Sequence, residues 1–98
     1  MSFHLVIRPE AEADMAEGFE WYETQRNGLG HDFLAKVRAA FQLVCENPNR
    51  HAVLYRDVRR TLTRRFPYKV FYLIADDSVE VIAVVHARRN PAVWQERV

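Results

Sequence analysis

The residues of this chain that could do chemistry are its arginines and one late histidine. Twelve of the fourteen basic residues are arginine, and seven bases accompany a single acid between Arg50 and Lys69. Arginine presents a planar fork that can bind a phosphate or carboxylate through two hydrogen bonds and can stack on nucleobases. We expect some of these cations to form an anion-binding surface, namely Arg59, Arg60, Arg64, Arg65, Lys69, Arg88 and Arg89.

The charge pattern also allows a plainer interpretation of the same residues. They could be solvated strand side chains, or partners for the acids of a first helix. The charges are polarised along the chain although the net charge is only +1, because Glu10 to Glu23 holds six acids and no base. If both arginine pairs lie in a strand, each pair places one guanidinium on either face of the sheet.

His86 ends a predicted strand and precedes Arg88 and Arg89 by two and three residues. A histidine can move protons near neutral pH, and nearby arginines can stabilise a phosphorane-like transition state, so metal-free RNA cleavage is conceivable. That chemistry needs a complementary acid or base. No tyrosine follows Tyr72, and only Glu96 accompanies the tail. We therefore favour a strand-end histidine that hydrogen-bonds to backbone.

The sequence offers no set of side chains suited to a metal or a cofactor. The four histidines are scattered, and no glycine-rich loop has phosphate-binding spacing. Cys45 is the single cysteine, which excludes an intramolecular disulfide and fits a reducing cytoplasm. No apolar run approaches the roughly 20 residues that span a bilayer, and the N-terminus lacks an export signal, so we expect a cytoplasmic protein without membrane contact.

One domain over residues 1–98 must position these groups. Its composition, 49% hydrophobic and 28% charged, is that of an ordinary folded domain. A chain of this length buries only about two-thirds of its unfolded surface, so we expect modest stability that a bound partner raises.

A strand and two tandem helices are predicted in the first half. Residues 3–7 are a short apolar strand, and Pro9 opens a helix whose apolar residues recur at helical spacing. The glycines near residue 28 break that helix, and a second apolar stripe runs to Pro48. Trp21 lies off the first stripe, so we expect it to be exposed and available to a protein partner.

Strands are predicted to dominate the second half. The segment from Val53 to Arg65 reads as a strand with a bulge or strong twist, because its alternation is not strict. Residues 68–75 and 79–85 are apolar on both parities, which indicates a central β-hairpin covered on both faces. Asn90 can cap a final short helix with Pro91 in its first turn and Trp94 within it.

The ordered set of these features resembles the toxins of the RelE/ParE superfamily. The resemblance covers essentially the whole chain and rests on Pro9 and 11–15, Phe33-Leu34, Val37, Pro48, Arg59-Arg60, Phe66-Pro67-Tyr68, Val70, Tyr72, His86, Arg88 and an R-x-P-x-x-W tail at residues 89–94. It implies an α+β fold in which a helical hairpin packs on a twisted antiparallel sheet, in the order β-α-α-β-β-β with a short C-terminal helix. It also implies a cognate antitoxin whose flexible segment wraps the toxin.

Two activities compete within that superfamily. The RelE-like branch cuts mRNA on the ribosome with sheet lysines and arginines plus a late tyrosine or histidine, whereas the ParE-like branch blocks DNA gyrase by protein contact. The tail here, H-x-R-R-x-P-x-x-W without tyrosine, resembles the second branch more.

We therefore expect a plasmid-stabilisation toxin that binds DNA gyrase, needs no cofactor and contacts DNA only through its antitoxin. The expected target-binding residues are the seven cations named above together with Trp94, and the expected antitoxin contacts are Trp21, Arg60 and Arg64. One alternative is a ribosome-dependent mRNA endoribonuclease with Arg60, Arg64 and Arg89 on phosphate and His86 as acid or base. Another is a non-toxic partner in an autoregulatory antitoxin complex.

Overall fold

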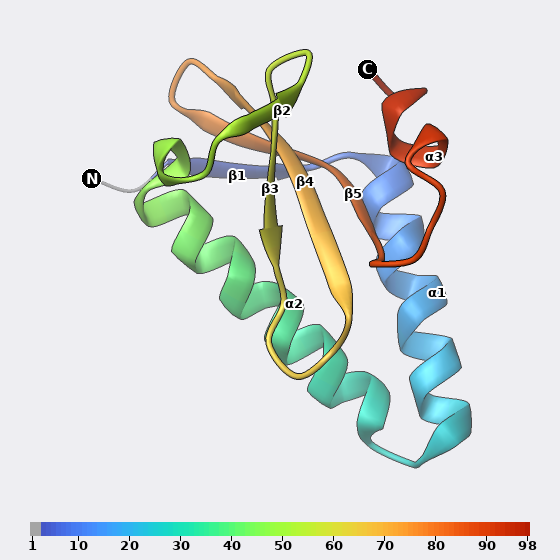
Figure 1. The fold of residues 1–98 in the computed structure, drawn as a ribbon. Helices are drawn as coiled ribbons and strands as arrows, with labels where there is room; N and C mark the ends of the chain where they lie inside the picture. The colour runs from blue at the N-terminus through green and yellow to red at the C-terminus, as the bar shows by residue number, and fades with distance from the viewer. Residues whose placement is uncertain (1–2) are drawn as a thin grey trace.

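The computed structural model describes residues 3–98. Its elements are β1 (His4–Ile7), α1 (Pro9–Gln25), α2 (Leu29–Glu46), the 3-10 turn η1 (Pro48–Arg50), β2 (Val53–Tyr55), β3 (Val58–Leu62), β4 (Tyr68–Ala75), β5 (Ser78–His86) and α3 (Ala92–Gln95). Figure 1 shows α1 and α2 as two arms that diverge from the turn between them and lie against the sheet. The predicted α+β architecture is confirmed.

The five strands form one sheet in the order β1-β5-β4-β3-β2. β1 is parallel to β5, whereas the other neighbours are antiparallel. The hairpin β4–β5 therefore lies inside the sheet, as its apolar sequence predicts. The parallel pairing of β1 with β5 was not predicted. β1 lies at one edge of the sheet, and the helical hairpin leads the chain from there to β2 at the opposite edge.

Both faces of the central hairpin are covered. The helices bury one face, including Val70, Tyr72 and Val84, while α3 and its neighbours bury the other, including Phe71 and Val85. Because successive strand residues point to opposite faces, two covers require apolar residues on both parities. This arrangement explains the unbroken apolar run that the sequence shows.

An aromatic cluster joins the helical hairpin to the sheet. Tyr22 and Phe33 come from the two helices, and Phe66 and Tyr68 come from the start of β4 and the loop before it. Their ring centroids lie between 4.7 and 6.1 Å apart. Gly18 makes room for this cluster, because a Cβ there would lie 2.7 Å from the Phe33 ring.

The prediction of one strand from Val53 to Arg65 was wrong. The chain instead makes two strands joined by Arg56 and Asp57, whose φ angles are 45° and 66°. Two consecutive positive φ values are the geometry of a tight type I′ hairpin turn. The predicted irregularity is also present, because the register of β2 against β3 shifts between Val53 and Tyr55. The strand also ends at Leu62, so Arg64 and Arg65 lie in the following loop and not on alternate strand faces.

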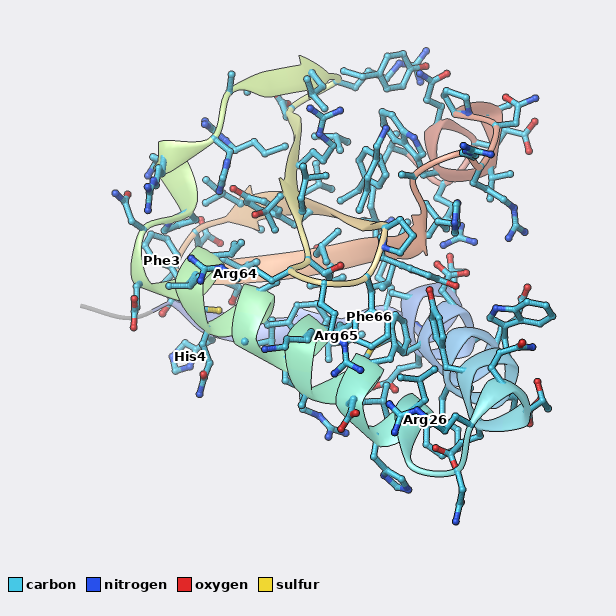
Figure 2. All side chains as sticks on the ribbon, turned by 60° about the horizontal axis from the view of Figure 1, so that its bottom comes forward. Phe3, His4, Arg26, Arg64, Arg65 and Phe66 are labelled. Atoms are coloured by element: carbon cyan, nitrogen blue, oxygen red, sulfur yellow. The ribbon has the colours of Figure 1, made fainter. Side chains whose placement is uncertain are left out.

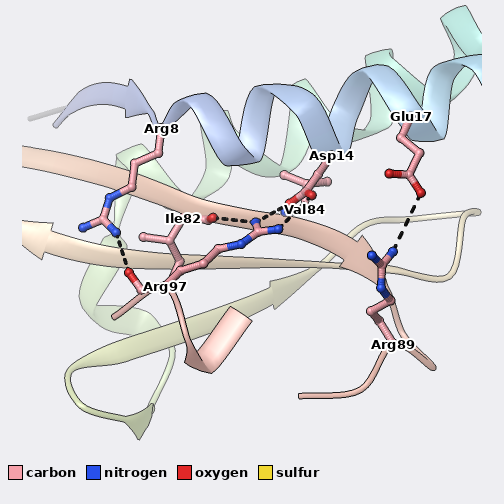
Figure 3. A network of polar contacts seen from close by, with 7 residues as sticks. All are labelled: Arg8, Asp14, Glu17, Ile82, Val84, Arg89 and Arg97. Atoms are coloured by element: carbon pink, nitrogen blue, oxygen red, sulfur yellow. Dashed lines mark hydrogen bonds and ion pairs between the residues drawn. The ribbon is translucent and has the colours of Figure 1, made fainter. Parts of the chain in front are cut away.

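A partly buried ion pair connects the C-terminal segment to the first helix (Figure 3). Arg97 makes two hydrogen bonds to Asp14, of 2.6 and 3.1 Å, and a third of 3.0 Å to the carbonyl of Ile82. Asp14 also accepts from the Val84 N–H at 3.0 Å. The register of β5 shifts beside Ile82, where a β-bulge frees that carbonyl from the ladder.

Glu23 caps the second helix from the first. Its carboxylate accepts a 2.8 Å hydrogen bond from the Gly30 N–H at the start of α2. Backbone hydrogen bonds, above all from Gly28, together with the nearby His31, hold the pKa of Glu23 below its ordinary value of 4.5. An ionised carboxylate satisfies N–H groups that the helix start leaves unpaired.

Arg97→Met should lower the free energy of unfolding by about 3 kcal/mol, because it leaves the partly buried Asp14 without its charge partner. The side chains of Arg97 and Asp14 are 17% and 10% exposed. Urea unfolding followed by circular dichroism measures the change. The matched control is Arg38→Met, at an exposed position of α2, where a change within about 0.5 kcal/mol is expected. Equal losses in the two variants would show that the ion pair contributes nothing specific.

Glu23→Gln should lower the melting temperature at neutral pH, and the difference from the wild type should close in acid. A carboxyl whose folded pKa is depressed contributes stability that is present above its unfolded pKa and is lost as the pH falls through the folded value. The closing therefore occurs below the ordinary pKa of 4.5. Thermal scans across this range test it, and a difference independent of pH contradicts the capping role.

Candidate interaction surface

The two arginines of strand β3 lie on opposite faces of the sheet. Arg59 lies across from Tyr72, which belongs to the helix-side core, and Arg60 lies across from Phe71, which belongs to the α3-side core. Residues directly opposite on antiparallel strands share a face. The expected split of this pair between two faces is confirmed.

Part of the α3-side face carries an uncovered patch. Leu62 lies across from Lys69, on the same face as Arg60, and Leu62 is 59% exposed. The short helix α3 covers only the middle of this face, where the Trp94 ring stacks on Phe71 with centroids 4.1 Å apart. Leu62, with Arg60 and Lys69 on the same face, is therefore left accessible beside the α3-side core.

A groove runs between α2 and β3 and encloses about 450 Å³. Ala39, Ala40, Leu43, Thr61 and Leu62 form its walls, and three charged side chains stand at its rim, namely Lys36, Glu46 and Arg64. Leu43 is 56% exposed. The ladder between β2 and β3 reaches only Val58 and Arg59, so β2 leaves the outer edge of Arg60–Leu62 unpaired. Apolar surface, an open strand edge and cations thus meet in one place.

The loop between β3 and β4 holds Arg64 and Arg65 beside α2 (Figure 2). Arg65 has a φ of 70°, contacts Asp32 at 3.3 Å and lies over the Phe66 ring. Arg26 also approaches Asp32, at 3.6 Å. Arg65 therefore links the loop to the tip of the helical hairpin, while Arg64 stands at the rim of the groove.

His86 ends β5 on the helix side of the sheet. It lies across from Tyr68, with ring centroids 5.6 Å apart, and its Nδ1 accepts a 3.1 Å hydrogen bond from the Arg88 N–H. The favoured interpretation, a strand-end histidine bonded to backbone, is confirmed. Lys69 lies across from the neighbouring Val85 and faces the other way. Nearby, Arg89 pairs with Glu17 at 3.8 Å on exposed surface, where such pairs are weak.

The two tryptophans have opposite environments. Trp21 is 59% exposed on α1, as its place off the apolar stripe predicted. Trp94 is 6% exposed and packs in the second core, so the structure gives it a packing role. Leu43 and Leu62 were not singled out from the sequence. The available signal was the same one that identified Trp21, since Leu43 is an apolar residue off its helix stripe.

Within residues 3–98 no group of three or more histidine, cysteine or acidic side chains is placed to hold a metal ion. Nor does any helix of this part of the chain have the length and apolar character to cross a membrane.

A helical hairpin on a small sheet with a short C-terminal helix is the fold expected for a small toxin of the RelE/ParE superfamily. Residues 5–91 match the family described as ParE toxin of type II toxin-antitoxin system, parDE, and the chain belongs to that family. It is 27% identical over 92 residues to toxin ParE2 of Mycobacterium tuberculosis strain CDC 1551, covering 93% of this chain and 88% of the relative.

Two solved structures share the fold. The chromosomal ParDE system from P. aeruginosa matches with a TM-score of 0.77 at 12% identity, covering 87% of this chain and 96% of that one. The intact E. coli RelBE toxin-antitoxin complex matches with a TM-score of 0.67 at 22% identity, covering 90% and 100%. Both superfamily branches therefore have this architecture, so the fold alone does not choose between their activities.

Proposed function

We propose that this toxin arrests growth by binding DNA gyrase, without catalysing a reaction, and that a cognate antitoxin neutralises it. The observation that carries the proposal is the separation of two sheet cations from His86, which has only Arg89 of the expected phosphate-binding arginines on its side. Arg60 and Lys69 lie on the α3 side of the sheet, whereas His86 lies on the helix side. An acid or base must come within hydrogen-bond reach of the same phosphodiester that the cations hold.

Gyrase as the target rests on membership in the ParE family and on the tail. Arg89, Pro91 and Trp94 retain the R-x-P-x-x-W pattern, and no tyrosine follows Tyr72. Trp94 supports this role indirectly, because its stacking on Phe71 holds the tail against the sheet. The expected target surface then consists of the half-buried Arg60 and Lys69 and the exposed Arg88 and Arg89.

A second candidate function is RNA cleavage on the ribosome. One observation favours it, which is that the half-buried Arg60 and Lys69 lie on the same face of the sheet. These two cations lack a catalytic partner, since the Nδ1 of His86 is engaged by backbone on the opposite face. We therefore rank cleavage below binding.

His86→Ala should leave growth arrest essentially intact, because inhibition by contact does not use a proton-transfer residue. Loss of such a residue from a nuclease typically costs about 10²–10⁴-fold in rate. The measurement is growth after induction of each variant, with and without the antitoxin, at matched soluble expression.

Primer extension on cellular messages and a DNA-damage reporter identify the target in the same cells. Intact messages with an active reporter support gyrase. New codon-linked cuts, or a folded His86→Ala protein that no longer arrests growth, overturn the proposal. Unimpaired growth with the wild-type chain leaves only the non-toxic partner in an autoregulatory complex.

The antitoxin is proposed to occupy the groove between α2 and β3. An incoming segment could pair with the open edge at Arg60–Leu62 and bury Leu43, while its acidic residues meet Arg60 and Arg64. Backbone pairing and apolar burial supply affinity, whereas the charges mainly speed association. Trp21 stands on the other helix as an exposed anchor for the rest of that segment.

Leu43→Glu should weaken antitoxin binding at least about tenfold, mostly through faster dissociation, because it places a charge in an apolar contact. Arg60→Glu with Arg64→Glu should instead slow association and reduce its salt dependence. Surface plasmon resonance across a salt series separates the two effects. The control is Leu5→Glu, an exposed leucine on the opposite edge strand. Association rates that change neither with the arginine reversals nor with salt would show that these cations lie outside the docking site.

A further inference from the structure

The turn η1 is held firmly against the sheet. The Tyr72 hydroxyl donates a 2.8 Å hydrogen bond to the carbonyl of Pro48, and Pro48 itself is buried. Arg59 crosses to the same turn and donates to the carbonyls of Asn49, at 3.3 Å, and of His51. The turn and β3 therefore form one rigid unit, so side chains on both keep fixed relative positions.

This unit carries three arginines at the edge of the sheet, with Arg59 and Arg60 on opposite faces of β3. Arg50 lies on η1, and Arg59 and Arg60 lie on β3. His51 stands two residues before Val53, which pairs with Arg59, so it lies beside the strand that carries the other two arginines. Burial, and then the charges of Arg50, Arg59 and Arg60, lower the pKa of His51. The four residues form what we call the η1 corner.

The η1 corner has no countercharge among residues 3–98. The ion pairs of this part of the chain involve His4, Arg8, Arg26, Arg65, Arg89 and Arg97, and none involves Arg50, Arg59 or Arg60. Like charges held together repel one another, and a bound anion relieves that repulsion.

We propose that the η1 corner binds backbone phosphates of double-stranded DNA. Guanidinium groups hold phosphate oxygens through paired hydrogen bonds, and several cations around one point suit a polyanion better than a single carboxylate. The choice of DNA rests on the proposed target, because gyrase works on DNA and the toxin would meet that DNA when it binds. This revises the expectation that the toxin reaches DNA only through its antitoxin.

Such contacts position a protein on DNA without reading its sequence. They add a second attachment to the complex, since Lys69, Arg88 and Arg89 remain for the protein target. They also leave Arg60 shared between DNA and the antitoxin, so antitoxin bound in the α2–β3 groove would cover one edge of the corner.

The test is fluorescence anisotropy of a short duplex with purified toxin, from about 50 to 200 mM salt, with no gyrase present. Arg50→Gln with Arg60→Gln leaves the Arg59 contacts to η1 in place. If each arginine holds one phosphate, this double variant should reduce the slope of log K against log salt by about 1.8. The control, Arg26→Gln with Arg38→Gln, removes the same charge from the helical hairpin and should leave the slope unchanged.

A local readout accompanies the affinity. In NMR titrations, bound phosphate should raise the pKa of His51 in the wild type and raise it less in the Arg50→Gln, Arg60→Gln variant. A purely structural role for these arginines would not produce a DNA-dependent pKa.

Three results would overturn the proposal. The wild type could fail to bind DNA, both double variants could lose the same slope, or oligoglutamate of matched charge could displace the duplex, which would assign the corner to an acidic polypeptide. Because gyrase is absent, loss of DNA binding leaves gyrase inhibition by protein contact intact. Conversely, a toxin that binds DNA but spares gyrase refutes only the proposed target.

Discussion

The alternation of side chains across the hairpin β4–β5 is the constraint on which the rest of this structure depends. Each strand must bury residues on both faces, because the helices cover one and α3 covers the other. The same alternation extends to the polar residues. It separates Lys69 from His86 and Arg59 from Arg60, so the chemistry available on each face is decided by strand parity. Contact with a target then fits this surface better than catalysis.

Polar side-chain contacts hold the helices, α3 and η1 against that hairpin. Arg97 and Asp14 fasten the C-terminal segment to α1, and Glu23 joins the two helices at their turn. Tyr72 and Arg59 fix η1 to the sheet in the same manner. Each of these side chains satisfies backbone groups that the elements themselves leave unpaired, so the small apolar core is supplemented by directed hydrogen bonds. These contacts hold η1 against β3, so the arginines on the two elements keep defined relative positions.

Much of the fold could be predicted because it depends on local patterns. Apolar spacing located both helices, and apolar runs on both parities located β4 and β5. The turn at Arg56 and Asp57 was not predicted, because neither residue is the glycine or asparagine usual at two consecutive positive φ values. The η1 corner and the groove were not predicted, for a different reason. They bring together residues from separate elements, Arg50 with Arg60 and Leu43 with Leu62, and only the pairing register reveals such neighbours.

We propose that the toxin acts by contact with its target and not by catalytic turnover. A titration of purified gyrase with purified toxin, followed by DNA supercoiling, tests it most directly. Supercoiling should fall in proportion to the toxin added and reach its limit when the enzyme is saturated, and the toxin should leave ribosome-bound message intact. Cleavage of that message by amounts of toxin far below the ribosome concentration, with supercoiling unaffected, would contradict the account.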